Sequence, residues 1–188
     1  MTGQQQGHEP PMRPSDEANK EQLQLARAQG EALTRALEHM TGNEAHDGGE
    51  QAAGDYLVGY AVEEAEGMYL MRDGALEWHN PDEENVHVEV SVRDRADGRF
   101  VPGLTVHATL IDGAGNEVGR HRQPYLWHPW LYHYGRNWKV PGDGTYTLRV
   151  HIAPPDFPRH DKINGRRFAE PVEVEFTGVS IETGQKKS

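Results

Sequence analysis

The sequence predicts an all-β fold, an immunoglobulin-like antiparallel β-sandwich with an N-terminal helical and disordered extension. Three observations lead to this prediction. From Asp55 onward, short runs of β-branched and aromatic residues alternate with turn-forming residues. Several runs alternate apolar and polar residues with the period of two that is typical of a half-buried strand. No helical pattern separates them, and about seven consecutive short strands without crossover helices favour an antiparallel sandwich.

The N-terminal extension, residues 1–54, is predicted to hold a disordered segment, a helix and a linker. Residues 1–15 are rich in Gln, Gly and Pro, a composition typical of disorder. Residues 16–40 carry a thin apolar stripe and begin with acidic residues, which predicts a helix with Ser15 as its N-cap. Residues 41–54 are polar and Gly-rich, which predicts a flexible linker.

The sandwich domain is expected over residues 55–180, followed by a disordered tail at 181–188. Its predicted strands are Tyr56–Glu63, Met68–Met71, Val86–Asp94, Leu104–Ile111, Gly142–Ile152 and Val172–Thr177. In the third of these the valines face the core. His87 and Glu89 leave the opposite face side by side, because alternate residues of a strand share a face. We expect that face to be partly exposed.

Composition excludes several functions. The chain has a net charge of −11, which repels phosphate backbones and argues against nucleic-acid binding. No apolar run approaches the roughly 20 residues of a transmembrane helix. Cysteine is absent, so disulfides, thiolate metal sites and cysteine nucleophiles are excluded, and no serine lies in a Gly-x-Ser-x-Gly turn. The first residues do not resemble a secretory signal, so we expect either a cytoplasmic protein or one whose export segment is lost or replaced.

Histidine and aromatic residues concentrate in residues 127–135, which contain two His, two Trp and two Tyr. Imidazole is the commonest protein metal ligand, and aromatic neighbours would form a dry wall around it. A second histidine, His160, lies in a proline-rich loop whose rigidity would fix its direction. Together with His87 and Glu89, His133 and His160 indicate one metal site assembled from three distant segments.

Four short signatures occur in order between Gly59 and Phe176. They are Glu66-Gly67-Met68, His87-Val88-Glu89, His133-Tyr134-Gly135-Arg136-Asn137 before Pro141–Tyr146, and Arg159-His160 before Phe168–Pro171. In these signatures the chain resembles the Fe2+-transport-protein family, periplasmic metal-binding β-sandwich proteins that accompany iron permeases. The resemblance implies a site for a divalent metal ion formed by His87, Glu89, His133 and His160. It also implies a homodimer with the sites near its interface, an iron permease as partner and a periplasmic location.

Three imidazoles and a carboxylate suit Cu(II), Fe(II), Zn(II) or Mn(II). The family commonly carries a methionine shortly before His-Tyr-Gly, and this chain has no methionine after Met71. The resemblance leaves the thioether to Met68 or Met71, or its place to His128. We therefore expect Cu(II) to bind better than Cu(I), and affinity to fall as the pH drops through the ordinary histidine range near ~6.5.

Metal capture for iron or copper uptake, without turnover of a substrate, is the function that these observations favour. A carbohydrate-binding or adhesive β-sandwich is the alternative, and exposed, coplanar aromatic rings would support it. Its candidate platform is Tyr125, Trp127, Trp130 and Trp138. A metallo-hydrolase is a third possibility, which would need an open coordination position and Glu89 or Asp161 as a base. We assign no catalytic residue and expect no enzyme.

Overall fold

The computed structural model describes residues 12–186. The predicted disorder of residues 1–15 therefore falls mostly outside the described residues. Helix α1 (Lys20–His39) leads into a π-helical turn, η1 (Met40–Glu44). The strands that follow are β1 (Asp47–Ala53), β2 (Tyr56–Glu63), β3 (Met68–Arg72), β4 (Ala75–His79), β5 (Val86–Asp94), β6 (Val106–Ile111), β7 (Glu117–Gln123), β8 (Tyr125–Leu126), β9 (His133–Trp138), β10 (Gly144–Ile152) and β11 (Val172–Ile181).

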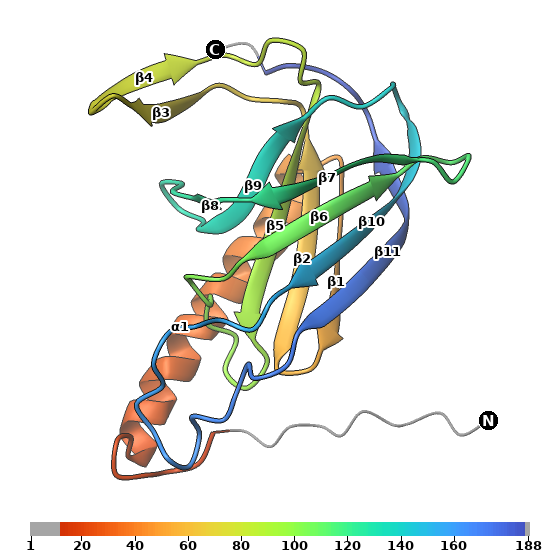
Figure 1. Cartoon of the computed structure of the whole chain (residues 1–188). Helices are drawn as coiled ribbons and strands as arrows, with labels where there is room; N and C mark the ends of the chain where they lie inside the picture. Colours follow the sequence, from red (N-terminus) through yellow and green to blue (C-terminus); the bar gives the residue numbers. More distant parts are fainter. Residues whose placement is uncertain (1–11, 187–188) are drawn as a thin grey trace, which may run out of the picture.

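The strands form the predicted antiparallel sandwich (Figure 1). One sheet has the order β1-β2-β5-β9-β8 and the other the order β11-β10-β6-β7, while β3 and β4 form a separate hairpin. The apolar sides of both sheets meet in one core, to which the valines of β5 contribute. The alternation in β5, β6, β10 and β11 predicted this core because each strand turns one face to the opposite sheet.

Helix α1 begins at Lys20, four residues later than predicted. Its N-cap is Asn19, whose side-chain oxygen accepts from the backbone N–H of Gln22 at 2.9 Å, while the Gln22 side chain accepts from the backbone N–H of Asn19 at 2.8 Å. This reciprocal capping box satisfies two N–H groups that a helix start leaves unpaired. The prediction of Ser15 as N-cap is wrong: its hydroxyl donates to Asp161 at 2.7 Å and ties the chain start to the loop before β11.

Helix α1 and η1 cover the outer face of the five-stranded sheet, the face of β5 that points away from the core (Figure 1). The helix approaches so closely that a Cβ added at Gly30 would lie 1.7 Å from the carbonyl oxygen of Asp97. Further along, Thr34 accepts from the guanidinium of Arg93 at 2.7 Å. The expectation that the polar face of β5 is partly exposed is wrong, because every residue of the strand is buried.

Part of the predicted linker, and the predicted tail up to residue 186, belong to the folded domain. Residues 47–53 of the linker form β1, which pairs with β2 along its whole length. At the other end, Gln185 forms a parallel bridge with Ala65, and the backbone N–H of Lys186 donates to the carbonyl of Ala65 at 2.7 Å. Tertiary pairing overrides the weak strand propensity of the Gly-rich segment. No helix within residues 12–186 is long and apolar enough to cross a bilayer.

Candidate metal centre

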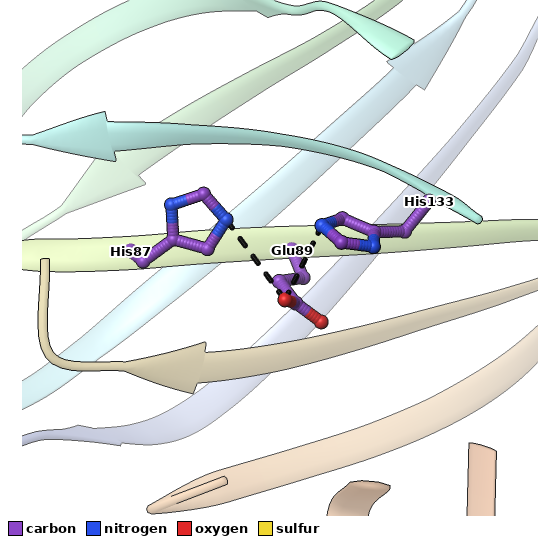
Figure 2. Close-up of side chains that lie close together, drawn as sticks. All are labelled: His87, Glu89 and His133. Atoms are coloured by element: carbon purple, nitrogen blue, oxygen red, sulfur yellow. Dashed lines mark ion pairs between the residues drawn. The ribbon is translucent and has the colours of Figure 1, made fainter. Parts of the chain in front are cut away.

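Three of the predicted ligands meet on the outer face of the five-stranded sheet (Figure 2). His87 and Glu89 lie on β5, and His133 opens β9. The antiparallel register of β5 and β9 pairs Glu89 with Gly135, so His133, two residues from Gly135, lies diagonally beside Glu89 on the same face. One ligand atom of each side chain lies within 4.8 Å of the others. The strand register thus brings together residues 46 positions apart in the chain.

Both imidazoles turn Nε2 toward the Glu89 carboxylate (Figure 2). The Nε2 atom of His133 is 3.3 Å from Glu89 Oε1, and that of His87 is 3.9 Å from the same oxygen. All three residues are buried, with His87 wholly inaccessible and Glu89 6% exposed. Neither Nε2 has a hydrogen-bond partner. Buried nitrogens without a partner are rare in folded proteins, and these two are free to act as donors to a metal ion.

The other ring nitrogen of each histidine is held by a hydrogen bond. His87 Nδ1 lies 2.8 Å from Asn137 Oδ1. The Asn137 amide is itself oriented by Glu66, because its Nδ2 donates to the Glu66 carbonyl at 2.7 Å and its Oδ1 accepts from the Glu66 N–H at 3.2 Å. His87 Nδ1 must therefore be the donor. His133 Nδ1 donates to the Leu131 carbonyl at 3.1 Å. Each Nε2 consequently carries a lone pair, the tautomer that a metal-binding histidine needs.

Gly135 leaves the space between the two imidazoles open. A Cβ at this position would lie 3.0 Å from His87 Nε2 and 3.1 Å from His133 Cδ2. It would also lie 3.0 Å from Leu126 Cδ1, so a side chain here has no room to move aside. The glycine of the His-Tyr-Gly motif therefore keeps a side chain out of the cradle in which an ion would lie.

Burial sets the protonation of the centre. It lowers the pKa of His87 and lowers that of His133 to about 4, so both imidazoles are neutral near pH 7. Burial, reinforced by the charges of Glu63 and Glu66, raises the pKa of Glu89 to about 8. Without a bound cation, Glu89 therefore keeps its proton at neutral pH. A dication beside this carboxyl would favour its ionised form and release that proton.

An acidic rim that the sequence did not reveal surrounds the centre. Glu66 Oε1 lies 3.8 Å from His87 Nε2, and Glu63 pairs across the strands with His87. The ammonium of Lys186 forms ion pairs with both glutamates, with Glu66 at 3.2 Å. Lys186 and Glu63 are 123 residues apart, and only the docking of the C-terminal segment brings them together. Two carboxylates and one ammonium thus lie beside the centre and leave a net negative charge there.

The structure does not bring His160 to this group. Its side chain is 91% exposed, and its Nδ1 lies 2.9 Å from a carboxylate oxygen of Glu17. The loop that carries it lies beside the start of α1, where Asp161 accepts from the Ser15 hydroxyl (Figure 1). The structure therefore does not place His160 beside the other three residues of the same chain, and its assignment as a ligand stays a prediction. The loop contacts the N-terminal segment, where the backbone N–H of Arg13 donates to the Asn164 side chain at 3.0 Å.

Of the three residues considered in place of the missing methionine, two lie away from the centre and one lies beside it. Met68 opens the β3–β4 hairpin and Met71 lies further along it, 66% exposed, and neither lines the cavities that border the centre. His128 does line a cleft of about 420 Å³ beside Glu89 and His133. Met40, which sequence reasoning placed in a segment without assigned function, lines the same cleft. No spacing in the sequence relates it to the ligands.

One of the four aromatic residues of the alternative sugar-binding platform does not reach the surface. Trp138 is buried, whereas Tyr125, Trp127, Trp130 and Tyr132 are exposed. The rings of Tyr125 and Tyr132 are tilted by 59°, and Trp130 meets His128 edge to face at 75°. These ring pairs lack the coplanar exposure that would support sugar stacking.

Comparison with known proteins agrees with the geometry. The model of the family described as Fe2+ transport protein matches residues 35–180. The chain belongs to the Fe2+ transport protein family. The match begins at residue 35, so the end of α1 and β1 lie within the family region, which extends further toward the N-terminus than the signatures alone indicated. A search of curated proteins found no match.

Solved structures share the fold of this family member. FetP from uropathogenic Escherichia coli has 22% identity and a TM-score of 0.57, over 71% of this chain and 95% of FetP. The copper-reconstituted P19 protein from Campylobacter jejuni has 17% identity and a TM-score of 0.60, over 73% of this chain and 96% of P19. A copper-bound variant of FetP is similar at 21% identity, with a TM-score of 0.56 over 71% of this chain and 95% of that one. More than a quarter of this chain has no counterpart in them.

Proposed function

We propose that this protein binds one divalent metal ion through His87, Glu89 and His133 and delivers it to an iron or copper uptake system. One observation carries the proposal: two buried Nε2 lone pairs without partners flank a buried carboxyl group. Leaving such groups without a partner costs about 1–3 kcal/mol each. Coordination of a cation would offset this cost, and the tautomers are already set for it.

The donor set supports a transition-metal dication. Two neutral imidazoles and one carboxylate suit Cu(II), Zn(II), Fe(II) or Mn(II), and on affinity alone Cu(II) ranks first. Membership of the Fe2+ transport protein family supports a role in iron handling, and copper-bound forms of FetP and P19 support copper as one ion the fold can hold. A periplasmic location and an iron permease as the recipient are part of the proposal, supported by the family membership.

The role we propose is binding and transfer, not turnover. The three ligands are buried, and a side chain at Gly135 would come within 3.0 Å of His87 Nε2. His160 enters the proposal only as a ligand from a second copy of the chain, since its exposed side chain is accessible to a neighbour. A homodimer that shares its sites in this way would supply a fourth donor.

Calorimetric titration with Zn(II) and Cu(II) tests the proposal. We expect about one ion per chain, and His133→Ala should lower the affinity at least a hundredfold. His151→Ala is the matched control, because His151 lies on β10 in the other sheet and should leave binding unchanged. Equal binding by wild type and the His133 variant would contradict the proposal. His160→Ala should weaken binding only under conditions in which the protein is a dimer.

A further inference from the structure

Met40 lies in the wall of both cavities that reach the metal centre. One, of about 220 Å³, lies between α1 with η1 and the five-stranded sheet, and the other is the cleft of about 420 Å³. Glu89 and His133 line both cavities together with Met40. Met40 is 6% exposed, and it is the one methionine among residues 12–186 that lines either of these cavities. Met40 is thus buried in the walls of the same two cavities as two of the three ligands.

The backbone at Met40 departs from the regular helix. Helix α1 ends at His39, and the N–H of Ala45 donates to the Met40 carbonyl at 3.0 Å, five residues back. Such π-turns are rare and are found frequently at functional sites. The ring of His39 packs edge to face on Trp130, with centroids 5.7 Å apart, and this contact fixes the end of the helix. The turn thus places residue 40 over the sheet.

Met40 also contacts the residue that orients His133. It packs with Leu131 and Ala61 in a small buried cluster, separate from the main core. The carbonyl of Leu131 accepts the hydrogen bond from His133 Nδ1. A displacement of Met40 would therefore shift Leu131, and with it the hydrogen bond that orients the His133 imidazole.

Met40 contacts apolar residues on one side and a charged cleft on the other. The cleft that it lines is also formed by charged residues of three segments, namely Glu44, Glu63, Glu66 and Lys186. A flexible side chain with a polarisable sulfur suits such a boundary between apolar packing and a charged cleft. Thioether sulfur is a soft ligand that favours Cu(I), whereas imidazole and carboxylate serve harder dications.

We infer that Met40 supplies a sulfur ligand to the ion held by His87, Glu89 and His133, so that the centre retains copper as Cu(I) as well as Cu(II). The inference rests on the proposed function and deepens it. It gives the N-terminal segment a role, the delivery of a sulfur donor from the π-helical turn that follows α1. It also replaces the expectation that Cu(I) binds poorly for want of a sulfur after Met71.

Anaerobic competition of Cu(I) against a chromogenic Cu(I) chelator tests the inference. Met40→Leu keeps the apolar volume and removes the sulfur. We expect a loss of Cu(I) affinity of at least tenfold, while Zn(II) affinity stays within threefold of wild type. Met71→Leu is the matched control, since Met71 is exposed on the hairpin, and it should bind Cu(I) as wild type does.

X-ray absorption of the folded wild-type protein provides a measurement that no folding defect can obscure. The copper edge of the Cu(I)-loaded protein should show a sulfur neighbour, and selenomethionine-labelled protein should show a copper neighbour at the selenium edge. Wild-type protein without such a neighbour, or a Met40→Leu variant with wild-type Cu(I) affinity, overturns the inference. Retention of metal by His133→Ala would instead overturn the proposed function, so the two failures are distinguishable.

Discussion

Metal binding by this protein should release the proton of Glu89. Because the pKa of Glu89 is raised to about 8, the group is ~90% protonated at pH 7, and binding of a dication should release about 0.9 proton per ion. Two imidazoles with ordinary pKa values near ~6.5 would together release about 0.5. At pH 5.5 the order of the two numbers reverses. Glu89 should release about 1.0 proton, and His133, whose pKa is lowered to about 4, should release almost none. Two ordinary imidazoles would together release about 1.8.

Titration calorimetry with Zn(II) in pairs of buffers that differ in ionisation enthalpy counts these protons. Affinity should fall about tenfold for each pH unit below 8, without an inflection near ~6.5, which corrects the expectation drawn from unperturbed histidines. In Glu89→Gln the release at pH 7 should fall to nearly zero, while Glu117→Gln, an exposed control on β7, should behave as wild type. A release near 0.5 at pH 7 that climbs toward 1.8 at pH 5.5 would refute the assignment of the proton to Glu89.

Three further variants probe the cradle, its support and the helix above it. Gly135→Ala places a methyl group 3.0 Å from His87 Nε2 and should reduce Zn(II) affinity at least tenfold by calorimetry. Asn137→Ala removes the acceptor that sets the His87 tautomer, and calorimetry should find a loss of about 10- to 100-fold. Gly30→Ala drives a Cβ into the Asp97 carbonyl and should destabilise the fold by about 1–3 kcal/mol in urea unfolding. Wild-type values in any of the three would contradict the contact from which it is derived.

The sandwich could be predicted from the sequence where a strand has one apolar face. The alternating valines of β5 and the regular pattern of β10 reveal both the strands and the core side. Strand β1 could not be predicted in this way, because its sequence, Asp-Gly-Gly-Glu-Gln-Ala-Ala, has the composition of a linker. Its strand conformation comes from pairing with β2. Such pairing between strands has no local sequence pattern.

The metal centre could be predicted in part. His87 and Glu89 are two residues apart on a strand, and His133 stands in a distinctive motif, so the three ligands were recognisable. The burial of these ligands could not be predicted, because it depends on α1 crossing the sheet. That crossing includes the close contact between Gly30 and the loop at Asp97.

The position of His160 and the other residues of the cleft could not be predicted for the same reason. His160 was assigned by motif, yet its position depends on the pairing of its loop with the N-terminal segment. Met40, Glu63 and Lys186 carry no motif. Glu63 reaches the cleft through the pairing of β2 with β5, and Met40 and Lys186 reach it through the docking of the N- and C-terminal segments. Ligands that lie on one pair of strands can be predicted from the register of the strands. Residues that reach the site by docking of terminal segments can be located only in the folded structure.

A crystal structure of the Cu(II)-loaded protein, with anomalous data collected at the copper edge, tests the central claim most directly. We expect one strong anomalous peak between the Nε2 atoms of His87 and His133 and the carboxylate of Glu89, at about 2.0–2.2 Å from each, the usual range for such ligands. A protein whose copper lies elsewhere, for example at His160 and Glu17, with both Nε2 atoms still unliganded, would contradict it.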